Sequence, residues 1–127
     1  MKGDIQTFDD IKLLVQSFYS KAQYDDTIGY FFTEVMEIDW ENHFPRMYQF
    51  WESVLLGKAT YKGNPMLKHI ALHRKEALTD EHFERWIRIW NETVDLHFEG
   101  VIADKAKSRA CSIKDLMKFK VGQVSDV

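Results

Sequence analysis

Residues 61–73 read Tyr-Lys-Gly-Asn-Pro-Met-Leu-Lys-His-Ile-Ala-Leu-His, and they contain the most informative pattern in this chain of 127 residues. The turn signal Gly63-Asn64-Pro65 predicts the start of a short helix. Its apolar residues surround one histidine, His69, and are Met66, Leu67, Ile70 and Leu72. A histidine in an apolar setting can be a metal ligand, but a buried histidine with a satisfied hydrogen bond is more common. This stretch alone leaves both interpretations open.

The rest of the chain has a helical pattern. Apolar residues recur with a period near 3.6 over residues 8–22, 80–99 and 101–119, and a short helical segment is expected over 28–35. Thr79 or Asp80 is a typical N-terminal cap, and Gly100 closes the helix that follows. No window alternates with a period of two and no hairpin signal occurs. The sequence therefore predicts an all-α fold.

Two helices carry more specific expectations. Asp39 or Asn42 could cap a helix that ends at Gly57, but Pro45 is disfavoured in a helix interior. We therefore expect a regular helix from about Phe44, or a separate turn at residues 40–43 before it. In the last helix we expect the following residues to point inward: Ile102, Ala106, Ala110, Ile113, Leu116 and Met117.

Composition limits the classes of function. The length fits one domain, residues 1–127, with an ordered core of about residues 8–119. A net charge of −3 and the lack of a basic cluster argue against a nucleic-acid partner. No apolar run reaches the roughly 20 residues of a membrane span, and Cys111 is the single cysteine. We expect a cytoplasmic protein with no membrane partner, no disulfide and no thiolate metal cluster.

Several short motifs, in order and spacing, resemble those of the truncated haemoglobins, and the third group of that family most of all. They are Phe18-Tyr19, Phe31-Phe32, His43, Phe50-Trp51, Gly63-Asn64-Pro65 through His69, Phe83 and Arg85-Trp86. The resemblance covers about residues 8–119 and implies a globin-like, two-over-two helical sandwich around one haem b group with its iron. The chain lacks the Gly-Gly pairs of other truncated haemoglobins, which is consistent with the third group.

The resemblance assigns four residues to the iron site. His69 matches the proximal ligand of the haem iron, whose other ring nitrogen should donate to a backbone carbonyl. Tyr19 matches the hydroxyl donor that stabilises the negative charge on bound dioxygen, and Trp86 could be a second donor. His43 matches the distal gate. Each also has a structural alternative, since these residue types commonly fill cores or lie at the surface.

Other residues would surround the haem. The candidate apolar walls are Phe32, Met47, Phe50 and Phe83, whereas Trp51 should pack between helices. The candidates for the propionate edge are Arg46, Lys68, Arg74 and Tyr61. Any of these could instead be an ordinary core or surface residue.

The resemblance implies a protein that binds dioxygen and other small diatomic ligands. Nitric oxide or peroxide detoxification remains open and would need an external reductase. We expect a monomer or a weak dimer. Two alternatives are a zinc site built on His69 and His73, with His82 or His97, and a helical interaction module that presents aromatic stripes to a partner.

Overall fold

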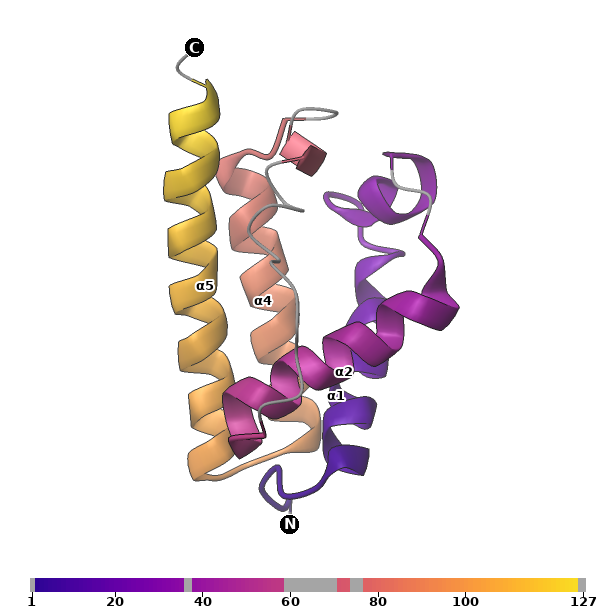
Figure 1. Cartoon of the computed structure of the whole chain (residues 1–127), viewed down its shortest axis with the longest axis vertical. Coiled ribbons are helices and arrows are strands. Elements are labelled where there is room, and N and C mark those ends of the chain that lie inside the picture. Colours follow the sequence, from indigo (N-terminus) through magenta and orange to yellow (C-terminus); the bar gives the residue numbers. More distant parts are fainter. Residues whose placement is uncertain (1, 36–37, 59–70, 74–76, 126–127) are drawn as a thin grey trace.

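The computed structural model describes residues 2–35, 38–58, 71–73 and 77–125, with side chains through Val121. This part of the chain contains helices and no strand, as the sequence predicts. Its elements are α1 (Phe8–Ala22), the π-helix η1 (Phe31–Val35), α2 (Trp40–Leu56), α4 (Asp80–His97) and α5 (Val101–Ser125) (Figure 1).

The helices form two contacting pairs. Helices α4 and α5 lie side by side and antiparallel, joined by a tight turn at Gly100 (Figure 1). Helix α1 contacts both α2 and α4, and α2 also contacts α5. This arrangement is the two-over-two sandwich that the resemblance implies.

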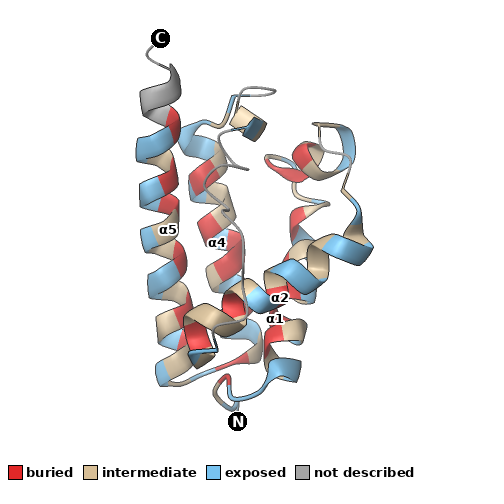
Figure 2. Ribbon diagram, in the orientation of Figure 1, coloured by how far each residue is buried: buried red, intermediate tan, exposed pale blue. Residues whose placement is uncertain are grey.

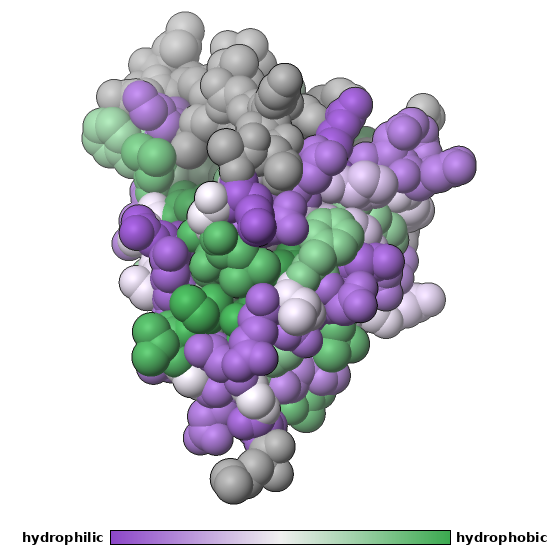
Figure 3. Space-filling model, turned by 60° about the horizontal axis from the view of Figure 1, so that its bottom comes forward, coloured by the Kyte–Doolittle hydropathy of each residue, from purple (hydrophilic) through white to green (hydrophobic). Residues whose placement is uncertain are grey.

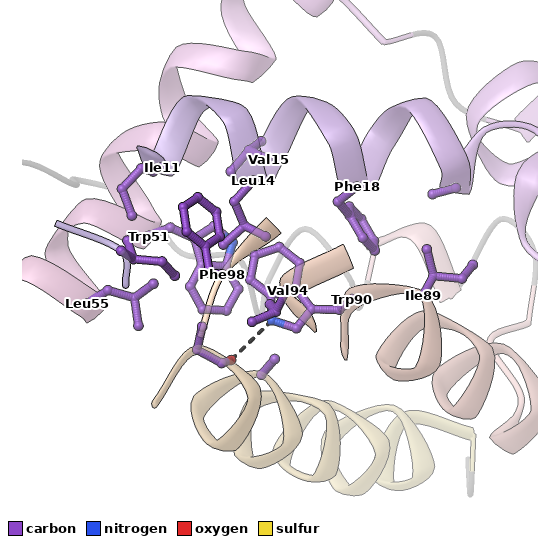
Figure 4. Packing of buried hydrophobic residues seen from close by; sticks show 14 of the residues in the cluster. Ile11, Leu14, Val15, Phe18, Trp51, Leu55, Ile89, Trp90, Val94 and Phe98 are labelled. Atoms are coloured by element: carbon purple, nitrogen blue, oxygen red, sulfur yellow. Dashed lines mark hydrogen bonds between the residues drawn. The ribbon is translucent and has the colours of Figure 1, made fainter. Parts of the chain in front are cut away.

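A single large core joins the two pairs. Trp90 of α4 stacks on Trp51 of α2 with ring centroids 4.3 Å apart, so Trp51 packs between helices as expected. The indole nitrogen of Trp90 also donates a hydrogen bond to the carbonyl oxygen of Ala106 on α5 at 3.1 Å (Figure 4). Phe18 of α1 packs edge-on against Trp90. The buried faces of α1, α4 and α5 point toward this core (Figure 2).

Helices α1 and α4 start with capping boxes. The Thr79 hydroxyl accepts the backbone N–H of His82, and the His82 ring accepts the backbone N–H of Thr79 in return. Thr79, rather than Asp80, is therefore the cap of α4. Thr7 and Asp10 make the corresponding exchange at α1, which supplies partners to N–H groups that a helix start leaves unpaired.

The expectation that Asp39 caps this helix and that it ends at Gly57 is confirmed, whereas a regular start near Phe44 and a separate turn at residues 40–43 are both wrong, because α2 is continuous from Trp40 and contains Pro45 in its interior. The proline removes one backbone donor, but the amides of Asn42 and His43 still donate to the carbonyl oxygen of Asp39. The aromatic side chains of this first turn pack on α1, and that packing outweighs the local cost of proline. Asp39 is the N-cap residue, although its carboxylate accepts the Asn42 side chain instead of a backbone amide.

Helix α5 differs from expectation at one inward position and at its end. Leu116 is 50% exposed, so its predicted inward orientation is wrong, whereas Met117 is buried. The helix also continues to Ser125, beyond its expected end near residue 119, and Ile5 is buried before α1 begins. The helical period places Leu116 one step outside the buried face on which Met117 lies.

The surface mixes polar and apolar side chains. On the face in Figure 3, apolar side chains gather near the centre and polar ones surround them. Apolar atoms form a large share of any folded protein's surface, so this group does not by itself indicate a docking site. Among the described residues, no helix has the length and apolarity needed to cross a membrane.

Candidate ligand-binding site

Tyr19 and His43 form a hydrogen-bonded pair between α1 and α2. The Nε2 atom of His43 lies 3.0 Å from the hydroxyl oxygen of Tyr19, and their rings meet edge-on. The two residues are 24 positions apart in the chain, so the crossing of α1 and α2 brings them together. The structure thus places together two of the three residues that the resemblance assigns to the distal side.

The direction of this hydrogen bond decides what the pair can do. When His43 carries its proton on Nε2, it donates to Tyr19, and the tyrosine hydroxyl proton is left to donate to a ligand. When His43 carries its proton on Nδ1, Tyr19 donates to it, and that proton is occupied. Whether the Tyr19 hydroxyl is available to donate to a ligand therefore depends on which ring nitrogen of His43 carries the proton.

Among the described residues, five rings surround that of Tyr19, and we call them the aromatic box. Their centroids lie 5.1–5.6 Å from that of Tyr19 and all five meet it at steep angles. They belong to Phe18, Phe32, Trp40, His43 and Phe44. Burial raises the pKa of the Tyr19 hydroxyl far above its usual value, because the phenolate would lose its hydration. Tyr19 consequently remains a neutral donor throughout the physiological pH range.

Trp86 and Tyr19 both pack edge-on against Phe18. The Phe18 ring meets Tyr19 at 5.1 Å and Trp86 at 6.0 Å, and Trp86 stacks with Trp90 at 6.4 Å. Trp86 is half-buried, and its indole N–H donates to no acceptor within the described part of the chain. An indole N–H with no acceptor among the described residues, beside an apolar ring, is suited to bind a small polar ligand.

The candidate wall residues fall into two groups. Met47 and Phe50 are half-buried on the same face of α2 as His43, and Phe32 belongs to the aromatic box. Phe50 also lines an open groove of about 380 Å³ between α2 and α5, together with Val54, Arg109, Ser112, Ile113 and Leu116. Phe83 lies apart, in a separate buried cluster with Met117 and Val121.

Several predicted site residues lie outside the described residues. These are His69, Tyr61, Lys68 and Arg74. Arg46 is described and is exposed on α2, one position before Met47. Its assignment to the propionate edge stays a prediction, as does that of His69 to the iron.

The described histidines offer little to a zinc ion. The His73 Nδ1 atom accepts the backbone N–H of Leu78 at 2.9 Å. In His82, Nδ1 accepts from Thr79 and Nε2 lies 3.4 Å from the Tyr30 hydroxyl, so both nitrogens are engaged. Within the described residues, no three histidine, cysteine or acidic side chains are close enough to share a metal. His97 therefore has no ligand cluster to join in this part of the chain.

Sequence reasoning missed two members of the aromatic box, Trp40 and Phe44. Both rings lie against Tyr19, at 5.4 and 5.6 Å. Trp40 lies three positions before His43 and four before Phe44, which is a usable signal, because residues three or four apart share one helix face. That signal requires the helix to be continuous through Pro45, which the proline argued against.

The described side chains fit a haem site on its distal side. Such a site needs apolar walls and a few hydrogen-bond donors aimed at a small ligand. Met47, Phe50 and Phe32 supply apolar surface, whereas the Tyr19 hydroxyl and the Trp86 indole supply donors. His69, which the resemblance assigns to the proximal side, lies outside the described residues.

Comparisons with known proteins agree with this geometry. Residues 4–121 match the bacterial-like globin family. The chain is 26% identical over 129 residues to the group 3 truncated hemoglobin ctb of Campylobacter jejuni, covering 96% of this chain and 98% of that protein. It also superposes on the crystal structure of the group III truncated hemoglobin from Campylobacter jejuni with a TM-score of 0.81 and 25% identity, covering 95% of each chain. Since the family match spans nearly the whole chain, this protein belongs to the bacterial-like globins.

Proposed function

We propose that this globin binds haem b through His69 and presents Tyr19 and Trp86 as hydrogen-bond donors to dioxygen or another small diatomic ligand. The observation that supports the proposal most is the Tyr19 hydroxyl, enclosed in the aromatic box and 3.0 Å from His43. A neutral phenol in an apolar enclosure donates more effectively than one that water solvates. The globin family and its group III relatives support the presence of a haem.

The roles of the residues follow from their chemistry. When bound, the haem would supply an iron with an open coordination position for a small ligand. His69 would hold the group through its iron, and Arg46, Lys68, Arg74 and Tyr61 are the candidates to meet its propionates. Tyr19 would donate a hydrogen bond to a ligand that carries negative charge, a contact that contributes about 1.5–3 kcal/mol. His43 would set the direction of that donation.

A catalytic role in nitric oxide or peroxide detoxification is the second candidate. Two donors whose rings both contact Phe18 suit a ligand on which charge develops during reaction, because preorganised donors stabilise such charge. Turnover would also require electrons from an external reductase. Ligand binding remains the first proposal because it needs no additional partner.

Titration of the purified protein with haemin tests the proposal. We expect saturable one-to-one uptake with a sharp Soret band that shifts cleanly when the reduced sample meets carbon monoxide. His69→Ala should abolish the histidine-ligated spectrum, whereas the matched variant His73→Ala should keep it. The absence of saturable uptake would contradict the haem site. A histidine-ligated spectrum that survives in His69→Ala and disappears in His73→Ala would move the ligand to His73.

A further inference from the structure

We infer that Trp40 is a positioning residue for the ligand site, because it holds the imidazole of His43 against the hydroxyl of Tyr19. This inference rests on the proposed function in one respect only, the effect on ligand kinetics. The placement of His43 can be tested without any ligand.

The ring of Trp40 touches both members of the pair. Its centroid lies 5.4 Å from that of Tyr19 and 5.7 Å from that of His43, and it meets both at steep angles. Trp40 and His43 are three positions apart at the start of α2, so they share one side of the first turn. The His43 ring therefore has an aromatic neighbour on α1 and another on its own helix, and these limit its rotation toward solvent.

Two further contacts fix Trp40 itself. Its ring lies 5.1 Å from Phe44, and it stacks on Phe32 of η1 at 6.4 Å with an interplanar angle of 27°. Trp40 thus joins three elements, α1, η1 and α2, at the point where His43 meets Tyr19. Among the described rings its neighbours are all members of the aromatic box or Tyr19 itself.

Trp40 is not a core residue. It is half-buried and lies outside the main buried cluster, whereas Trp51 and Trp90 are almost fully buried there. A tryptophan that only filled the core would contact that cluster. The contacts of Trp40 are with the ligand site, so its removal should affect the site more than the fold.

The experiment compares Trp40→Ala, Trp40→Phe and Phe8→Ala. Phe8 is the matched control, since it is also the first residue of its helix and is 41% exposed, but its ring touches Tyr48. The first readout is the nuclear Overhauser contact between the His43 and Tyr19 rings in the protein without added haemin. The second is the dioxygen release rate of the haemin-loaded, reduced protein, and thermal unfolding accompanies both.

In Trp40→Ala we expect the His43–Tyr19 contact to weaken and dioxygen release to accelerate by about fivefold, the size of one lost aromatic pair contact. Trp40→Phe should restore both to near wild type, and Phe8→Ala should change neither. A wild-type ring contact in Trp40→Ala would overturn the inference, and so would an equal effect of Phe8→Ala. If the ring contact is lost but Tyr19→Phe leaves release unchanged, the positioning role stands and the proposed role of Tyr19 as ligand donor fails.

Discussion

The Nε atom of Arg85 on α4 lies 2.8 Å from the carboxylate Oδ1 of Asp25, in the turn that follows α1. The other oxygen of Asp25 accepts the backbone N–H groups of Thr27 and Ile28. One carboxylate therefore closes the turn and fastens it to α4. This turn directly follows the end of α1 that carries Tyr19.

Asp25→Asn should lower stability in a pH-dependent way. Burial alone would raise the pKa of Asp25. The hydrogen bonds from Arg85, Ile28 and Thr27 lower this pKa by more than burial raises it, so the net shift is downward. A lowered pKa means that the charged form stabilises the fold above about pH 4, and that this stability is lost as the pH falls through the folded-state value. We expect the free energy of unfolding of the variant to be about 1–2 kcal/mol lower than that of the wild type at pH 7.

Denaturant unfolding between pH 7 and pH 3 checks this, with Asp26→Asn as the control, because Asp26 is the exposed neighbour. The gap between wild type and Asp25→Asn should close at low pH. A gap that stays constant across this range would show that the charge of Asp25 is not what matters.

Tyr19→Phe should accelerate dioxygen release. The variant keeps the ring in the aromatic box and removes only the hydroxyl, so the loss of a hydrogen bond to a charged acceptor predicts roughly a 10- to 150-fold faster release. Stopped-flow displacement of dioxygen by carbon monoxide measures the rate. Tyr24→Phe, at a residue 80% exposed, should leave the rate unchanged. Equal release rates in wild type and Tyr19→Phe would remove the Tyr19 hydroxyl from the ligand site.

Trp86→Phe should change mainly ligand release, whereas Trp90→Phe should change mainly stability. The Trp86 indole N–H has no acceptor in the described part of the chain, so its loss should alter ligand release with little change in stability. The Trp90 indole donates to Ala106 and its ring stacks on Trp51, so its loss should reduce stability by about 1 kcal/mol or more and leave ligand release near wild type. Kinetics and thermal unfolding of both variants separate the two roles. Ligand kinetics that respond to Trp90→Phe alone would contradict this assignment.

The sequence was sufficient to predict where most of the helices lie, but not how they all pack against one another. The 3.6-residue period locates α1 and α4 closely, since a helix that buries one face must repeat its apolar residues at that spacing. Asp39 was correctly predicted as a cap of α2, but a helix continuous through Pro45 was not expected. The local cost of the proline is outweighed by packing of the first turn on α1. Such packing depends on how two helices cross, which a local pattern does not contain.

The candidate site shows the same division. Tyr19 and His43 were found through family motifs, and the structure brings them within hydrogen-bonding distance. Trp40 was missed because its neighbours come from three elements, and no spacing in the sequence reports all three. The carboxylate of Asp4 is a more distant case, since its partner Ile102 is 98 positions away.

Asp4 caps α5 from the other end of the chain, and Asp4→Ala should therefore destabilise the fold. Its carboxylate accepts the backbone N–H groups of Ile102 at 2.9 Å and Ala103 at 2.8 Å, which a helix start otherwise leaves unpaired. Loss of such a cap should lower the free energy of unfolding by about 0.5–2 kcal/mol. The control is Asp104→Ala, because Asp104 is an acidic residue in the first turn of the same helix with a side chain 81% exposed.

A second variant breaks the same cap from the opposite side. Gly100 has φ of +146°, and a Cβ atom there would lie 2.5 Å from Cγ of Asp4, so Gly100→Ala must displace the carboxylate and strain the backbone. We expect it to destabilise more than Asp4→Ala, and the double variant to lose less than the sum, since both act on one contact. Denaturant unfolding of the four proteins measures this coupling. Strictly additive losses would show that the Asp4 carboxylate and Gly100 contribute separately, and an Asp104→Ala loss as large as that of Asp4→Ala would assign the effect to the helix dipole instead of the cap.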